Sequence, residues 1–191
     1  MSFLTNRSLV HHIYTQNIDG LELKAEIPKE KILFAHGNSK EAHCCGCKKE
    51  IDIELQNNYI KDGKILYCPD EDCKMPCKPK IVFYGEKLPA DFADKAESIH
   101  ESDLAFIMGT SLKVMPFNYL PFFLSENTWR VVINKEKVGR EGPSGFAYDD
   151  VLSRDLFIPG ITDDVLKQLI HDCGWKDTFD LYVENISKEK I

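Results

Sequence analysis

Four cysteines arranged in two pairs place the strongest constraint on how this chain can fold. Cys44 and Cys47 form a Cys-x2-Cys pair, and Cys68 and Cys73 form a Cys-x4-Cys pair further along the chain. Zinc prefers four thiolates in a tetrahedron, and closely spaced cysteine pairs bend into the knuckles that hold such an ion. The sequence therefore predicts a structural zinc site without a carboxylate ligand. The metal would supply folding energy to a segment too small for a core of its own.

Spacing alone leaves part of the ligand set open. Cys45, Cys77 and His43 also lie in the cluster, and Cys73 with Cys77 makes a pair that could replace Cys68 with Cys73. Reduced thiols without a metal are the other interpretation. The cysteine count of seven is odd and the N-terminus shows no apolar leader, so we expect reduced thiols and a location in the cytosol or nucleus.

Composition narrows the class of protein. A length of 191 residues suits one domain with a real core and a small insert. The formal net charge is −7, so we expect no nucleic-acid partner. A zinc ribbon that binds nucleic acid would use the lysines around the cysteines, which are Lys48, Lys49, Lys74, Lys78 and Lys80. The sequence has no long apolar run, so we expect no membrane span.

Short apolar runs alternate with helical patterns along most of the chain. The predicted strands cover residues 9–14, 32–35, 104–108, 130–133 and 156–158, and the predicted helices cover residues 90–100, 117–124 and 163–172. Thr162 is the predicted N-cap of the last helix and Gly174 its C-cap. This alternation is typical of an α/β fold with a parallel sheet. Residues 40–80 break the pattern and suit a small metal-stapled insert.

Polar clusters follow several of the predicted strands. They are Gln16, Asn17 and Asp19; His36; Gly109, Thr110 and Ser111; and Asn134, Lys135 and Glu136. In parallel α/β sheets, ligands bind beyond the carboxyl ends of the strands, so we expect one shared pocket. Simpler interpretations stay open, because each cluster alone is ordinary loop composition and Asn17 or Asp19 can form an Asx-turn.

In this order the segments resemble the sirtuins, the NAD-dependent protein deacylases. Residues 14–22 (Tyr-Thr-Gln-Asn-Ile-Asp-Gly-Leu-Glu), Ala-His-Gly at 35–37, the two cysteine pairs, and residues 78–86, 109–114 and 133–136 carry the resemblance. It extends over about residues 9–175. It implies a Rossmann-like NAD-binding and catalytic domain formed by residues 1–39 and 81–191, with a zinc-binding small domain at 40–80. The implied reaction transfers the acyl group of an acetylated lysine to ADP-ribose and releases nicotinamide.

The resemblance also implies roles for individual residues. His36 matches the general base, a task that suits histidine because imidazole titrates near neutral pH. The implied NAD contacts are Gln16, Asn17 and Asp19 near the nicotinamide ribose, Gly109, Thr110 and Ser111 near phosphate and ribose, and Asn134, Lys135, Glu136 and Thr162 on the adenosine side. The acyl-peptide would lie between two segments as an added strand. These segments contain Val82, Phe83, Gly85 and Glu86 on one side and Val114 and Phe117 on the other.

The sequence departs from the family pattern in three respects. The spacing between Cys68 and Cys73 is longer than usual, and Lys80 stands where the family has an acidic residue. The family's N-terminal Gly-Ala-Gly unit and its cofactor loop do not occur in this sequence. We therefore expect a truncated sheet whose open edge favours self-association. The alternative function is a catalytically impaired remnant that acts as a zinc-stabilised peptide-binding module.

Overall fold

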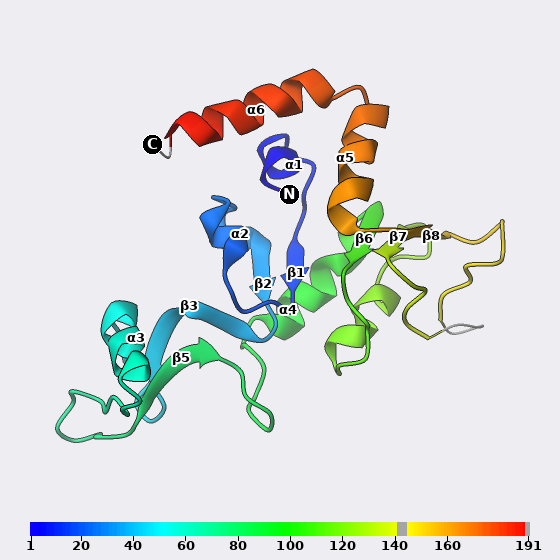
Figure 1. Cartoon of the computed structure of the whole chain (residues 1–191). Helices are drawn as coiled ribbons and strands as arrows, with labels where there is room; N and C mark the ends of the chain where they lie inside the picture. Colours follow the sequence, from blue (N-terminus) through cyan, green and yellow to red (C-terminus); the bar gives the residue numbers. More distant parts are fainter. Residues whose placement is uncertain (141–144, 190–191) are drawn as a thin grey trace. The chain divides into compact units, whose positions relative to one another are not determined.

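The computed structural model describes residues 1–140 and 145–189 of the chain (Figure 1). The chain divides into two compact units, Met1–Ala93 and Asp94–Ile191, and each is described by itself. Helix α4 (Phe92–Glu97) spans the boundary between them. The domain bounds expected from the sequence stay a prediction.

A short parallel sheet forms the core of the first unit. Strand β1 (Ile13–Thr15) pairs in parallel with β2 (Ile32–Phe34). The predicted strand 32–35 is confirmed, whereas the predicted strand 9–14 overlaps β1 only at residues 13 and 14. Ile27, Ile32 and Phe34 form a buried cluster against this sheet. Three short helical segments flank the strands: α1 (Ser2–Asn6), α2 (Leu21–Lys24) and η1 (Lys29–Lys31).

The cysteine-rich segment is more regular than the sequence indicated. Strand β3 (Gly37–Cys44) lies between β4 (Glu50–Ile51) and β5 (Cys77–Ile81) in an antiparallel sheet. Helix α3 (Ile53–Lys61) contacts β3 and β5. Its hydrophobic pattern was misleading, because Gln56 is buried whereas Leu55 and Ile60 are exposed.

An ion network on this antiparallel sheet accounts for the departure at Lys80. The Lys80 ammonium lies 2.9 Å from a carboxylate oxygen of Glu41 and 2.9 Å from one of Glu50. Lys29 also pairs with Glu41. Burial raises the pKa of Glu41, but hydrogen bonds from Lys29 and Lys80 outweigh this effect and lower it below its ordinary value. Lys80 therefore neutralises acidic side chains on both other strands of this sheet.

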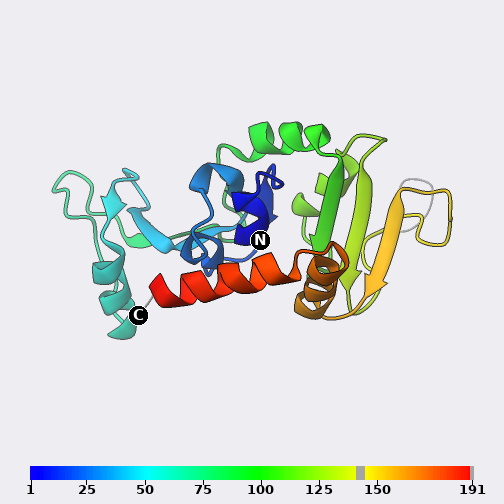
Figure 2. The ribbon, with the colours of Figure 1, turned by 90° about the horizontal axis from the view of Figure 1, so that it is seen from above.

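The second unit contains a three-stranded parallel sheet. Its strands are β6 (Leu104–Met108), β7 (Trp129–Asn134) and β8 (Asp155–Pro159), in that spatial order. The predicted strands 104–108, 130–133 and 156–158 are confirmed to within a residue or so at each end. Figure 2 shows the three arrowheads at one edge, near the start of α5 (Thr162–Asp172). Figure 1 shows α5 on one side of the sheet and the segment that contains η3 (Phe117–Phe122) on the other.

The helices of this unit differ in detail from those expected. The segment predicted as a helix over residues 117–124 is the 3₁₀ helix η3, which contains Pro121, a residue without the N–H that an α-helix needs. Thr162 is the first residue of α5 and not its N-cap, which is Ile161. The C-cap is Cys173 and not the predicted Gly174. Gly174 is the next residue and has a positive φ, as glycine often does directly after a helix C-cap. The remaining helices are η2 (Ser98–Glu101) and α6 (Lys176–Glu189).

A buried ion pair joins β7 to the start of β8. The Arg130 guanidinium donates to both carboxylate oxygens of Asp155, at 2.5 and 2.6 Å. It also donates to the carbonyl of Gly145, and the Asp155 carboxylate accepts from the backbone N–H of Ala147. The Phe146 ring lies 4.6 Å from the guanidinium carbon. Both charges are therefore satisfied away from water, and they fix the loop before β8.

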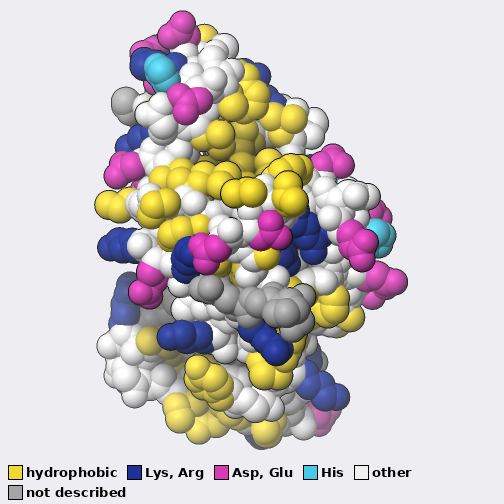
Figure 3. Space-filling model, turned by 90° about the vertical axis from the view of Figure 1, so that its right-hand side faces the viewer, with side chains coloured by type: hydrophobic (Ala, Val, Ile, Leu, Met, Phe, Trp, Pro, Cys, Tyr) yellow, Lys and Arg dark blue, Asp and Glu magenta, His cyan; other side chains and the backbone are white. Residues whose placement is uncertain are grey.

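Both outer strands of this sheet, β6 and β8, pair only with β7 among the described residues. Figure 3 shows hydrophobic side chains on the face that includes β8, and the exposed residues of β8 and its preceding loop include Val151, Leu152 and Leu156. Self-association through an open edge stays a prediction. None of the described helices has the length and apolar character needed to cross a membrane.

Removing the charge of Asp155 should destabilise the second unit strongly. We expect Asp155→Asn to lower the free energy of unfolding by about 3 kcal/mol, because it leaves a buried guanidinium without its counter-charge. Urea unfolding followed by tryptophan fluorescence measures the loss. The matched control is Asp180→Asn, which removes the same charge from an exposed pair with Lys176 and should change nothing measurable. Equal behaviour of the two variants would contradict the structural role of the buried pair.

Candidate functional site

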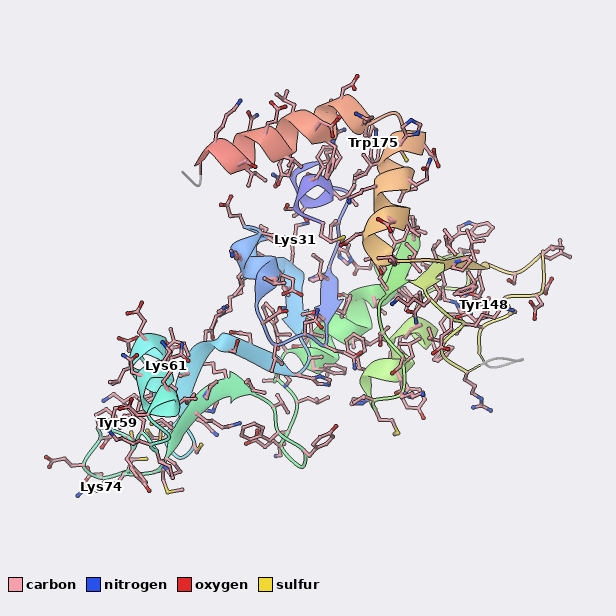
Figure 4. The ribbon with its side chains drawn as sticks, viewed as in Figure 1. Lys31, Tyr59, Lys61, Lys74, Tyr148 and Trp175 are labelled. Carbon is pink, nitrogen blue, oxygen red and sulfur yellow. The ribbon has the colours of Figure 1, made fainter. Side chains whose placement is uncertain are left out.

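The structure brings the four predicted ligand sulfurs together. The Sγ atoms of Cys44, Cys47, Cys68 and Cys73 all lie within 4.8 Å of one another. Two of the separations are 3.5 Å, between Cys44 and Cys73, and 3.6 Å, between Cys47 and Cys68. A zinc ion with sulfur ligands at about 2.3 Å requires tetrahedral edges of about 3.8 Å. The sulfur atoms therefore have the spacing of a zinc site, near the labelled Tyr59 in Figure 4.

The charges of these thiols favour a cation at their centre. Burial opposes ionisation of Cys44, but hydrogen bonds from the backbone N–H groups of Cys47 and Gly46 and from the Cys73 thiol outweigh it and lower the pKa of Cys44 to about 6. The backbone N–H of Asp70 favours the Cys68 thiolate, but burial and the neighbouring thiols raise the pKa of Cys68 to about 12. Ionisation of Cys44 thus opposes ionisation of Cys68. A zinc ion would offset this repulsion with its own positive charge and so favour the thiolate form of all four ligands.

The alternative ligand set is not the one that assembles. Cys77 is buried in β5, where it pairs in register with Cys44 and donates its backbone N–H to the carbonyl of Leu66 at 2.7 Å. It lies outside the group of four sulfurs that could hold a metal. The wider spacing between Cys68 and Cys73 is accommodated by a turn in which Asp70 accepts the backbone N–H of Cys73.

The position of His36 follows from the junction between β2 and β3. Its carbonyl accepts the backbone N–H of Val82 at 2.8 Å, which ties the junction to the segment after β5. Gly37 has a φ of +72°, and a Cβ at this position would lie 1.8 Å from the carbonyl oxygen of Lys80. Only glycine fits this close approach of two backbones.

The imidazole of His36 has a defined orientation. Its Nδ1 lies 3.3 Å from the carbonyl oxygen of Gln16. A carbonyl can only accept, so this contact requires the proton on Nδ1 and leaves the lone pair on Nε2. Among the described residues, Nε2 has no hydrogen-bond partner. The half-buried ring therefore keeps the lone pair of Nε2 unpaired among these residues.

The other predicted residues of the first polar cluster, Asn17 and Asp19, follow Gln16 in the loop after β1. The backbone N–H of Asn17 donates to the Thr15 hydroxyl, and Asn17 and Asp19 are exposed. The Asp19 carboxylate accepts the backbone N–H of Leu21 at 3.2 Å. The Asx-turn that the sequence left open is therefore present at Asp19. It does not occupy both carboxylate oxygens.

A tight turn follows β5 and carries the predicted peptide-contacting residues of this unit. The backbone N–H of Glu86 donates to the carbonyl of Phe83 at 3.0 Å, and the Glu86 carboxylate accepts the backbone N–H of Phe83 at 2.8 Å. Tyr84 is fully exposed, and Gly85 has a φ of +87° with open space where a side chain would stand. Val82, Phe83, Gly85 and Glu86 thus form one short structural element attached to His36.

The second unit gathers its polar residues at the carboxyl edge of the parallel sheet. The side-chain amide of Asn134 donates to the carbonyl of Thr110 at 3.2 Å, and its carbonyl oxygen accepts the backbone N–H of Lys135 at 3.0 Å. The backbone N–H of Gly109 donates to the carbonyl of Ile133. Asn134 therefore connects the loops that follow β6 and β7, where a ligand of a parallel sheet is expected.

The remaining predicted residues of this unit differ in how far their side chains are exposed. Ser111 and Glu136 are exposed, and Thr162 begins α5 directly after β8. Val114 is 38% exposed, whereas Phe117 is 8% exposed and belongs to the core under η3. Phe117 therefore supports this surface more than it faces outward.

Sequence reasoning missed two residues that shape the first unit. Asn38 is buried, and its side-chain oxygen accepts the backbone N–H of Lys40 at 2.9 Å, which shapes the start of β3. Lys78 was assigned to a lysine cluster, but its ammonium binds Glu86 at 2.6 Å. With Lys78 and Lys80 both paired to carboxylates, the basic face that a nucleic-acid site requires is weakened. The one available signal was the acidic Glu86 close after Lys78.

Comparison with known proteins identifies the family of this chain. The model of the Sir2 family matches residues 1–116, which is more than half of the chain. The chain belongs to the Sir2 family.

Curated relatives carry consistent names. The chain is 37% identical to the NAD-dependent deacetylase sir2A of Dictyostelium discoideum over 188 residues, which cover 97% of this chain and 36% of that protein. It is 34% identical to the NAD-dependent protein deacetylase sirtuin-2 of Danio rerio, over 92% of this chain and 49% of that protein. It is 37% identical to the NAD-dependent protein deacetylase sirtuin-3 of Mus musculus, over 73% of this chain and 41% of that protein. The chain thus spans between about a third and a half of the length of these relatives.

The purified chain should contain one zinc ion. We expect Cys68→Ser to lose the metal, because it removes one of four ligands, and Cys77→Ser to keep it, because that buried thiol lies outside the cluster. Elemental analysis by mass spectrometry gives the zinc content per chain. Zinc retained by Cys68→Ser and lost by Cys77→Ser would show that the ligand set is the alternative one.

Proposed function

We propose that this chain acts as an NAD-dependent protein-lysine deacetylase, which transfers an acyl group from acyl-lysine to ADP-ribose and releases nicotinamide. Membership of the Sir2 family and the names of its relatives support the reaction class. The observation that carries the proposal is the orientation of His36. Its Nδ1 is directed at a backbone carbonyl, so its Nε2 is available to accept a proton.

His36 is proposed as the general base. NAD supplies the ribose carbon that accepts the acyl oxygen as nicotinamide leaves. His36 would take a proton at Nε2 from a ribose hydroxyl, while the hydrogen bond between Nδ1 and the Gln16 carbonyl stabilises the imidazolium that results. The exposed Asn17 and Asp19 are proposed to contact the same ribose.

The carboxyl edge of the β6–β7–β8 sheet in the second unit is proposed to contact NAD. Gly109 has open space where a side chain would stand, so its backbone can approach a phosphate. Thr110 and Ser111 would contact phosphate and ribose, and Asn134, Lys135, Glu136 and Thr162 would contact the adenosine side. The connection from Asn134 to Thr110 supports this assignment because it fixes two of the loops.

Acetylated peptides are the proposed substrates. The turn formed by Val82, Phe83, Gly85 and Glu86 would pair with the peptide backbone. In the second unit, Val114 is the proposed peptide contact, and the buried Phe117 would support it. The zinc site would serve folding only, because all four of its ligands are cysteines. The zinc-binding small domain is proposed to cover residues 40–80. A location in the cytosol or nucleus stays a prediction.

Loss of the His36 imidazole should abolish turnover without unfolding the chain. We expect His36→Ala to reduce nicotinamide release from NAD and an acetyl-lysine peptide by roughly a hundredfold or more, because a positioned general base contributes about that much. The control is His171→Ala, which removes an exposed histidine from α5 and should retain full activity.

The outcome separates the two functions that the sequence allowed. A folded, zinc-loaded chain that binds the peptide without releasing nicotinamide would contradict the deacetylase proposal. That result would favour the zinc-stabilised peptide-binding module.

A further inference from the structure

Lys78 has an unusual concentration of contacts at the base of the turn after β5. Its ammonium lies 2.6 Å from the Glu86 carboxylate and donates to the carbonyl of Ile81 at 2.6 Å. It also lies 4.2 Å from the centre of the Phe83 ring. The Lys78 side chain is 14% exposed, compared with 43% for Glu86. The Lys78 side chain is therefore fixed by three contacts, all with residues of the turn or of the end of β5.

These contacts close the turn through Glu86. The same carboxylate that binds Lys78 also accepts the backbone N–H of Phe83 at 2.8 Å. Hydrogen bonding to Lys78, together with that N–H, lowers the pKa of Glu86 below its ordinary value. The Glu86 carboxylate thus stays ionised at neutral pH. It joins Lys78 on β5 to Phe83 in the turn.

The closed base leaves the tip of the turn open. Among the described residues, neither Tyr84 nor Gly85 forms a backbone hydrogen bond. Tyr84 is fully exposed, and Gly85 has open space around it. Binding an extended peptide to a backbone that is already fixed costs less conformational entropy, because the turn does not have to become ordered on binding.

We infer that Lys78 is a positioning residue for the acyl-peptide, acting through Glu86 to fix the turn whose tip receives the peptide backbone. Glu86 then serves the site by its internal bond to Lys78, and its side chain does not recognise the peptide. This inference rests on the proposed function, and it assigns to Lys78 a role in peptide affinity, with no part in the chemical step.

The inference makes a selective kinetic prediction. In the full chain, Lys78→Met should raise the Kd of an acetyl-lysine peptide about tenfold, because it removes a charged hydrogen bond that orders the turn. The turnover at saturating peptide and the KM for NAD should stay unchanged. Lys78→Arg, which keeps the charge and the donors, should restore most of the affinity.

Two comparisons separate positioning from a general loss of charge or fold. Lys87→Met removes an exposed lysine just beyond the turn that forms no ion pair with the described residues, and it should leave the Kd unchanged. The double variant Lys78→Met with Glu86→Gln should bind the peptide no more weakly than the weaker-binding of the two single variants. The reason is that both substitutions break the same ion pair. Nuclear magnetic resonance order parameters of Tyr84 and Gly85 should fall in Lys78→Met.

The outcomes distinguish this inference from the function on which it rests. Equal peptide Kd for the wild type and Lys78→Met, in a wild type that releases nicotinamide, would overturn the role of Lys78 alone. A fall in turnover at saturating peptide would overturn it as well. A wild type that neither binds the peptide nor releases nicotinamide would contradict the proposed function and, with it, this inference.

Discussion

The first unit depends on the cluster of four cysteine sulfur atoms, which lies at one end of strands β3 and β5. Cys44 ends β3, and Cys68 and Cys73 precede β5. At the opposite end of these strands, Gly37 passes against the carbonyl of Lys80. His36 and the turn after β5 therefore sit on the strands that the sulfur cluster secures. A metal ion held by these sulfur atoms would therefore act on the proposed general base His36 only through the strands, because His36 lies outside the sulfur cluster.

Ionic side chains are satisfied in three different ways in this chain. Arg130 and Asp155 are buried and bind each other with further partners on each side, so their removal is costly. Lys80 neutralises two carboxylates on a sheet surface. Lys78 connects a strand to a turn that is proposed to bind a peptide. Charged residues that look alike in the sequence therefore serve a core, a surface and a site.

Much of the second unit could be predicted because its sequence signals are local. The buried runs that form β6, β7 and β8 end in polar residues, and the parallel sheet brings those ends to one edge. The prediction failed where burial opposed the hydrophobic pattern. Helix α3 buries Gln56 and exposes Leu55 and Ile60, so its periodicity pointed to no helix. Pro121 turned an expected α-helix into a 3₁₀ helix.

The sequence by itself determined the ligand type of the metal site, the positions of the main strands and the family, because cysteine spacing, apolar runs and ordered motifs are properties of the chain. Only the tertiary structure decided that Cys68, and not Cys77, completes the sulfur cluster. It also decided which nitrogen of His36 faces a carbonyl, and that Lys78 and Glu86 form a pair. Each of these depends on the distance between atoms from separate segments, and spacing along the chain does not specify that distance.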